Sequence, residues 1–85
     1  MDNTFNNNDG NGVLLSGDIL MGTVFDGNQA DGNGLDGFAF GDNNGTFSNN
    51  TANDNGDMGY DGGTNNGTAK DNTGSGNTNG GNTYP

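Results

Sequence analysis

Apolar side chains are sparse along this chain and recur at regular intervals rather than in blocks. When the sequence is written in rows of 11 residues, one column is mostly apolar and holds Leu14, Phe25, Asp36, Phe47, Met58 and Ala69. A second, local spacing of five residues connects Leu15, Leu20, Phe25, Ala30, Leu35 and Phe40. No run places apolar residues three and four apart without an interrupting Gly, and Gly and Asn are poor helix formers. The pattern therefore predicts strands and turns, without helices.

Asn-Gly pairs mark the same grid. The Asn of each pair occupies one column, at Asn11, Asn33, Asn44, Asn55 and Asn66. Asn-Gly is a strong turn signal because both residues tolerate positive φ. Turns repeated at this interval leave about nine residues between them, which is enough for a strand. The sequence thus predicts short strands separated by Asn-Gly corners.

Two all-β arrangements fit this interval. Each unit of the grid could be one coil of a narrow β-solenoid, or the equivalent cross-β layer, with the Asn corners stacked and hydrogen-bonded along the stack. Alternatively, the units could be strands of an antiparallel meander. A meander needs alternating apolar and polar residues, which these segments lack. We therefore predict an all-β fold of stacked units of about 11 residues, ordered mostly by self-assembly.

The chain changes character along its length. Large apolar residues are concentrated between Val13 and Phe47, and none larger than Thr, Asn or Lys70 occurs between residues 61 and 83. The sequence therefore predicts an N-terminal segment (1–11), an ordered β region containing the repeats (12–60) and a polar flexible tail (61–85).

Composition supports a different alternative, intrinsic disorder. Asn, Gly, Asp, Thr and Ser make up 61 of the 85 residues, and Leu, Ile, Val and Phe only 12, with a formal net charge of −10. Such values are typical of disordered chains, because too little apolar surface is available to offset the entropy of ordering. A disordered acidic linker is therefore one alternative function.

The residue inventory excludes much chemistry. Cys, His, Trp and Glu are absent, and Lys70 is the only basic residue. Without Cys or His, zinc and haem sites are excluded, and no Ser or Thr has a His partner for catalysis. A single Lys disfavours nucleic acid as a partner. We expect no enzyme activity and no cofactor other than calcium.

The sequence also bears on location. The most apolar stretch runs from Val13 to Phe25 and is too short to span a bilayer. No basic start of a signal peptide is visible at the N-terminus. Glycosylation acceptor patterns, which this composition produces by itself, begin at Asn44, Asn49 and Asn66.

Several acidic residues stand in loops of the kind that calcium favours. Asp9, Asp26 and Asp31 are each followed by Gly and Asn, and Asp36 precedes Gly37. Calcium takes oxygen ligands, and Gly permits a tight loop, but no complete calcium motif is present because Glu is missing. The simpler interpretation is that these Asp residues initiate turns and keep the chain soluble. The sequence predicts weak calcium binding at most, at Asp9, Asp26, Asp31 and Asp36.

Two resemblances follow from these patterns. The triplets that begin at Leu15, Leu20, Phe25 and Leu35 are similar to pentapeptide-repeat proteins, which build a square β-helix, but Asp18 and Asn28 stand where that family has a small inward residue. Across its length the chain resembles the Asn/Gly/Thr-rich, cysteine-free repeat proteins of bacterial surface fibres and functional amyloids. That resemblance implies a secreted, self-assembling structural protein, extracellular or at the cell surface.

The sequence therefore predicts a homopolymer. The residues expected to carry assembly are the column Asn33, Asn44, Asn55 and Asn66, as stacked ladders, and the aromatic residues Phe25, Phe38, Phe40 and Phe47, as a thin dry interior. A monomeric β-solenoid that binds ice or a polysaccharide through a Thr/Asn face is an alternative. Thr46 and Thr68 share a column of the grid, but Asp57 separates them there, which weighs against that alternative.

Overall fold

The computed structural model describes all 85 residues as an all-β chain with no helix, so the predicted all-β class is confirmed. Its eight strands are only two or three residues long and form three separate sheets. The first sheet contains β1 (Val13–Leu14), β3 (Phe38–Ala39) and β6 (Tyr60–Asp61). The second contains β2 (Val24–Asp26), β4 (Thr46–Ser48) and β7 (Thr68–Lys70). The third contains β5 (Thr51–Asn53) and β8 (Thr73–Ser75).

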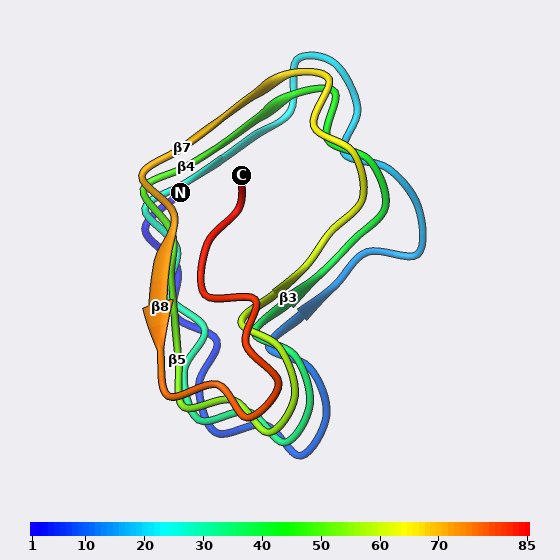
Figure 1. Cartoon of the computed structure of the whole chain (residues 1–85). Helices are drawn as coiled ribbons and strands as arrows, with labels where there is room; N and C mark the ends of the chain where they lie inside the picture. The colour runs from blue at the N-terminus through cyan, green and yellow to red at the C-terminus, as the bar shows by residue number, and fades with distance from the viewer.

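Every strand pair is parallel, and the two strands of each pair are one full circuit of the chain apart. Figure 1 shows the chain following the same closed path repeatedly, with each circuit lying on the one before. We call one such circuit a coil. From the second coil onward, equivalent residues such as Asn28 and Asn50 are 22 residues apart. The unit predicted from the sequence was therefore half of the true repeat, and two such units make one coil.

The first coil is longer than the others. Asn3 and Asn28 are 25 residues apart, whereas the next residues of the same column are separated by 22. The extra residues lie between Leu15 and Val24, where the path bulges outward (light blue in Figure 1). This bulge leaves Leu20 and Met21 exposed, at 68% and 88% of their surface.

Two columns of residues turn the chain at corners with positive φ. The first consists of Asp2, Gly27, Asn49 and Asp71, and the second of Asn7, Gly32, Asp54 and Gly76. Gly, Asn and Asp are the residues that adopt this left-handed conformation most readily, so the composition supplies the corners. The five Asn-Gly pairs of the grid, in contrast, contain no residue with positive φ. The chain does bend at the Gly of each pair, so the predicted corners are present but are not made by left-handed backbone.

Glycine is required in those pairs for a different reason. A Cβ atom at Gly56 would collide with the carbonyl oxygen of Gly34, and one at Gly67 with that of Gly45. These glycines let one coil lie close against the next. Each of the two columns needs a glycine in successive coils because the coils are stacked in register.

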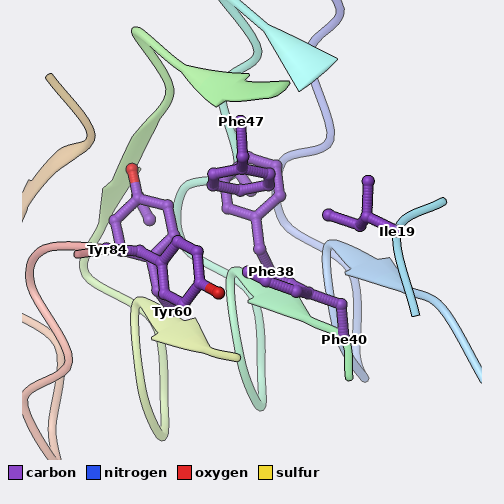
Figure 2. Packing of buried hydrophobic residues seen from close by; sticks show 8 residues of the cluster. Ile19, Phe38, Phe40, Phe47, Tyr60 and Tyr84 are labelled. Atoms are coloured by element: carbon purple, nitrogen blue, oxygen red, sulfur yellow. The ribbon is translucent and has the colours of Figure 1, made fainter. Parts of the chain in front are cut away.

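Aromatic rings fill the small interior (Figure 2). Phe47 lies at the centre, with ring centroids 4.8 Å from Phe40, 5.5 Å from Phe38 and 5.8 Å from Tyr60. Tyr84, close to the C-terminus, packs edge-on against the same ring at 5.6 Å. Edge-to-face packing of this kind stabilises aromatic clusters beyond the area that they bury.

Residues 61–85, for which the sequence predicts a flexible tail, contain β7 and β8 and continue two of the sheets. Asn72, Asn77 and Tyr84 are buried there. The C-terminal segment then turns inward from the path and lies across the last coil (red in Figure 1).

Candidate functional site

A column of buried asparagines ties successive coils together on the side of β5 and β8. We call Asn3, Asn28, Asn50 and Asn72 the first ladder. The backbone N–H and the side-chain Nδ2 of Asn28 both donate to Oδ1 of Asn50, at 2.9 and 3.2 Å. Asn50 donates in the same way to Oδ1 of Asn72, at 3.1 and 3.0 Å. The side chains of Asn50 and Asn72 therefore each accept two hydrogen bonds from the coil before them.

A second ladder repeats this arrangement five residues further along each coil, with Asn8, Asn33, Asn55 and Asn77. Asn33 donates to Oδ1 of Asn55 at 2.9 and 3.0 Å, and Asn55 to Oδ1 of Asn77 at 3.0 and 2.9 Å. Two parallel ladders, rather than one, fix both ends of the segment that contains the strands of the third sheet.

The second Nδ2 hydrogen of a ladder residue donates to a backbone carbonyl one coil back. Asn50 donates to the carbonyl oxygen of Phe25 at 3.2 Å, and Asn55 to that of Ala30 at 2.9 Å. Asn50 and Asn55 thus each make four side-chain hydrogen bonds and connect three coils. No buried side-chain nitrogen or oxygen lacks a hydrogen-bond partner. A buried polar network of this kind stabilises a fold only when every member is satisfied.

A third column works in the opposite direction. Here the backbone N–H of a later residue donates to the side chain of the earlier one, from Asp31 to Asn6 at 2.8 Å and from Asn53 to Asp31 at 2.8 Å. Ser75 continues the column by donating to Asn53 at 2.9 Å. Carboxylates make the same contact elsewhere, since Asp36 accepts from Met58 at 2.9 Å. Asp residues therefore serve as acceptors for backbone groups of the next coil.

The four asparagines predicted to form one ladder are divided between two sides of the coil. Asn33 and Asn55 belong to the second ladder, but Asn44 and Asn66 lie on another side, where Nδ2 of Asn66 donates to Oδ1 of Asn44 at 3.2 Å in an exposed contact. The division follows from the length of the true repeat, because one row of the sequence grid leads only halfway round the coil.

The first ladder was not predicted, although the sequence carries a signal for it. Pairs of asparagines five residues apart recur once per coil, as Asn28 with Asn33, Asn50 with Asn55, and Asn72 with Asn77. The grid obscures this signal because Asn28, Asn50 and Asn72 occupy only every second row of their column, alternating with Gly17, Ala39 and Asp61.

The predicted interior aromatics Phe38, Phe40 and Phe47 are buried, and Phe25 is half-buried beside Phe47, with ring centroids 5.9 Å apart. Tyr60 joins this group, and its hydroxyl lies 2.7 Å from the carbonyl oxygen of Asn50. Burial raises the pKa of Tyr60 above its ordinary value, so its hydroxyl stays protonated and donates to the backbone of the first ladder.

The residues predicted for calcium do not form a cluster. Asp9 is exposed, Asp26 and Asp31 are half-buried, and Asp36 is buried. Oδ1 of Asp26 accepts from Nδ2 of Asn49 at 2.7 Å. No three acidic side chains of the chain come together in a group that could hold a metal ion. Calcium binding at these positions stays a prediction.

The last coil ends in a short cap. We call residues 82–85 the C-terminal strap. The carbonyl oxygen of Tyr84 accepts from Nδ2 of Asn72 at 2.6 Å, and Oδ1 of Asn82 accepts from Nδ2 of Asn77 at 2.7 Å. The hydroxyl of Tyr84 lies 3.0 Å from the carbonyl oxygen of Gly63. Burial raises the pKa of this hydroxyl, and the nearby carboxylate of Asp42 raises it further. The strap thus ends both ladders and covers the aromatic interior.

The surface has no pocket, and the structure has no helix that is long and apolar enough to cross a membrane. Comparison with protein-family models, with curated proteins and with solved structures finds no match to this chain. The ladders and the two ends of the stack are therefore the features from which a function can be argued.

We expect Asn50→Ala to lower the free energy of unfolding by about 3 kcal/mol or more, because it leaves several buried donors and acceptors unpaired. Asn66→Ala is the matched control, since Asn66 is exposed and its side chain makes one surface hydrogen bond. We expect that control to change stability by less than about 0.5 kcal/mol. Urea titration followed by circular dichroism measures both, and equal effects of the two substitutions would contradict the role of the first ladder.

A second prediction concerns Asp36. Burial raises the pKa of Asp36 above its ordinary value of 3.8, and the carboxylates of Asp61 and Asp57 raise it further, against the opposing hydrogen bond from Met58. A raised folded-state pKa means that the stability contributed by the protonated form is complete below the ordinary pKa and is lost as the pH rises through the folded-state pKa.

We therefore expect Asp36→Asn to raise the melting temperature at neutral pH, because Asn keeps the acceptor for Met58 and has no charge. The gain should disappear below about pH 3.8, where the carboxyl is protonated in both states. Asp9→Asn removes the same charge from an exposed site and serves as the control. A gain for Asp36→Asn that does not depend on pH would show that another effect is responsible.

Proposed function

We propose that this chain is a β-solenoid that serves as a structural building block, and that copies stack along the axis of the coils into a homopolymeric fibre. The observation that carries this proposal is the direction of its hydrogen bonds. The three parallel sheets and both asparagine ladders run along one axis, from coil to coil. A stack of this kind has two ends, and each end presents the edges of several strands, which are templates for pairing with another chain.

The interior also supports a structural function. Nine polar or charged residues are buried, against nine apolar and aromatic ones, and the chain measures 29 × 21 × 18 Å. Its order therefore depends on repeated hydrogen bonds as much as on a hydrophobic core. Stacking further copies extends the same hydrogen bonds without any new type of contact, as in other stacked-strand assemblies.

Charge should control such stacking. The formal net charge is −10, and copies brought together along one axis repel each other until salt screens them or the carboxylates are protonated. The resemblance to bacterial surface-fibre proteins supports an extracellular or cell-surface location for the fibre, and calcium would screen the same charges there.

We expect the chain to remain monomeric at low ionic strength and neutral pH. Fibres should form as ionic strength or calcium concentration rises, or as the pH falls toward the isoelectric point of about 4.1. Sedimentation velocity and electron microscopy on the same samples measure this. Monomers under all of these conditions, at high protein concentration, would refute the proposal.

A second candidate is a monomer that binds ice or a polysaccharide through one face. In the third sheet Thr51 pairs with Thr73, and bridges through Gln29 connect Thr4 to the same column. Thr46 and Thr68 also pair directly, in the second sheet, without the intervening Asp57 that the sequence grid suggested. Columns of hydroxyl groups at the strand spacing of about 4.8 Å are the kind of regular array that this function needs.

This candidate predicts that the monomer slows ice growth or sediments with an insoluble polysaccharide such as cellulose. The substitution Thr73→Lys in the third sheet should then weaken or abolish binding, whereas Asn66→Lys adds the same charge at an exposed position outside both threonine columns and serves as the control. If neither ice nor polysaccharide interacts with the wild-type monomer, this candidate is wrong and the fibre is not affected.

A further inference from the structure

The C-terminal end of the stack presents backbone donors that have no partner within the chain. In the inner coils, the backbone N–H groups of Asn50 and Asn55 donate to a ladder oxygen one coil later, at 3.1 and 3.0 Å. Asn72 and Asn77 occupy the same columns, and their backbone N–H groups make no hydrogen bond in the structure. Their side-chain Nδ2 groups are held by the C-terminal strap instead.

The N-terminal end presents the matching acceptors. Oδ1 of Asn28 and of Asn33 each accept two hydrogen bonds from the preceding coil. Asn3 and Asn8 begin the two ladders, and their Oδ1 atoms accept none. Both residues are exposed. They are separated along the chain by the same five residues as Asn72 and Asn77, so the two ends have equal spacing.

The third column matches in the opposite direction. In that column later backbone N–H groups donate to earlier side chains, and it ends at Ser75, three residues after Asn72. It begins at Asn6, three residues after Asn3. The backbone N–H of Asn6 has no partner in the chain. The two ends of the stack are therefore complementary at three columns, and the third has reversed donors and acceptors.

We propose that a second copy of this chain stacks head to tail on the first, and that the C-terminal strap is an autoinhibitory contact that must move aside to admit it. In the stacked state, Oδ1 of Asn3 and of Asn8 in the second copy replace the carbonyl oxygen of Tyr84 and Oδ1 of Asn82 as acceptors for Asn72 and Asn77. This inference rests on the proposed fibre and identifies its interface. A head-to-tail contact of this kind does not close and therefore yields a filament.

The apolar residues at the two ends lie in one column. The ring of Tyr84 covers Phe40, with centroids 4.9 Å apart, and lies where a Cβ atom on Gly62 would meet it at 2.8 Å. Gly62 belongs to the column of Leu15 and Phe40, and Leu15 lies half-buried at the N-terminal end against the core. Leu15 follows Asn3 by the same number of residues as Tyr84 follows Asn72, so Leu15 of a second copy would lie in this column one coil beyond the slot of Tyr84.

One corner opposes stacking. Asp2 and Asp71 belong to the same positive-φ column, so the junction brings two carboxylates together. Repulsion between them falls as salt screens it. The strap and this corner both keep the chain monomeric at low ionic strength. The strap can be released by substituting Asn82 and Tyr84, which leaves the net charge of the chain unchanged, whereas removing the corner would change Asp2 or Asp71.

The test compares four versions of the full chain by sedimentation velocity and electron microscopy, at the ionic strength where wild-type fibres first form. The first is the wild type, and the second carries Asn82→Ala and Tyr84→Ala, which release the strap. The third adds Asn3→Ala and Asn8→Ala to the released chain. The fourth adds Asn44→Ala and Asn66→Ala instead, a pair of asparagines that lies outside the proposed junction.

We expect release of the strap to lower the concentration needed for fibres by roughly tenfold, and the Asn3 and Asn8 substitutions to reverse this. The control pair should leave the released chain unchanged. Because loss of Tyr84 also exposes the interior, Asn3→Ala with Asn8→Ala is tested in the otherwise intact chain as well. There it should raise the fibre concentration by a similar factor, while circular dichroism shows that the fold is kept.

Two results would overturn the inference and leave the proposed function intact. One is fibres that form equally well with and without Asn3 and Asn8, as they would if the released chains only aggregated through exposed rings. The other is a released strap that does not lower the fibre concentration. Failure of every version to form fibres at any ionic strength would instead overturn the proposed function.

Discussion

A buried asparagine side chain must have all of its hydrogen-bonding groups paired, and the rest of this structure depends on that requirement. Unpaired buried amide groups cost about 1–3 kcal/mol each, and the inner residues Asn50 and Asn55 each make four side-chain hydrogen bonds. A shift of the register by one residue would leave both ladders unpaired at the same time. The ladders therefore fix how each coil lies on the next, with equivalent residues 25 apart in the first coil and 22 apart in the later ones, although the residues between them are mostly small and polar.

The same requirement explains why so few apolar residues are sufficient. Coils held in register bring rings from different coils together, so that Phe25 lies beside Phe47 and Phe38 beside Tyr60, each pair one coil apart. Close stacking in turn requires Gly where one backbone meets the next, as at Gly56 against Gly34. The composition that is typical of disorder is here the composition that allows close stacking, because small residues let backbones approach and Asn supplies the hydrogen bonds between them.

The arrangement also accommodates a high negative charge. Carboxylates such as Asp31 and Asp36 accept backbone N–H groups from the following coil, so the acidic residues contribute hydrogen bonds between coils. The two ends of the stack differ, because the hydrogen bonds to every ladder oxygen point along the axis in one direction. That polarity leaves free ladder acceptors at one end and free ladder donors at the other, and it underlies both the fibre and the strap that we propose to control it.

The sequence by itself determined the all-β class, the absence of helices, the preference for stacked units and the exclusion of zinc, haem and thiol chemistry. These follow from residue types and from regular spacing, which are visible without a fold. The sequence also indicated Asn33, Asn55 and the Phe residues of the interior, but it assigned Asn44 and Asn66 to the same column and missed Asn28, Asn50 and Asn72.

Only the tertiary structure decided that the repeat is 22 residues, that the left-handed corners are at Asp2, Asn7 and their equivalents, and that Tyr84 closes the stack. The physical reason is that Asn, Asp and Gly are compatible with both extended and left-handed backbone, so residue identity does not show where the chain turns. The number of residues between corners sets the pairing register. That number is fixed only when the hydrogen bonds of neighbouring coils are satisfied together.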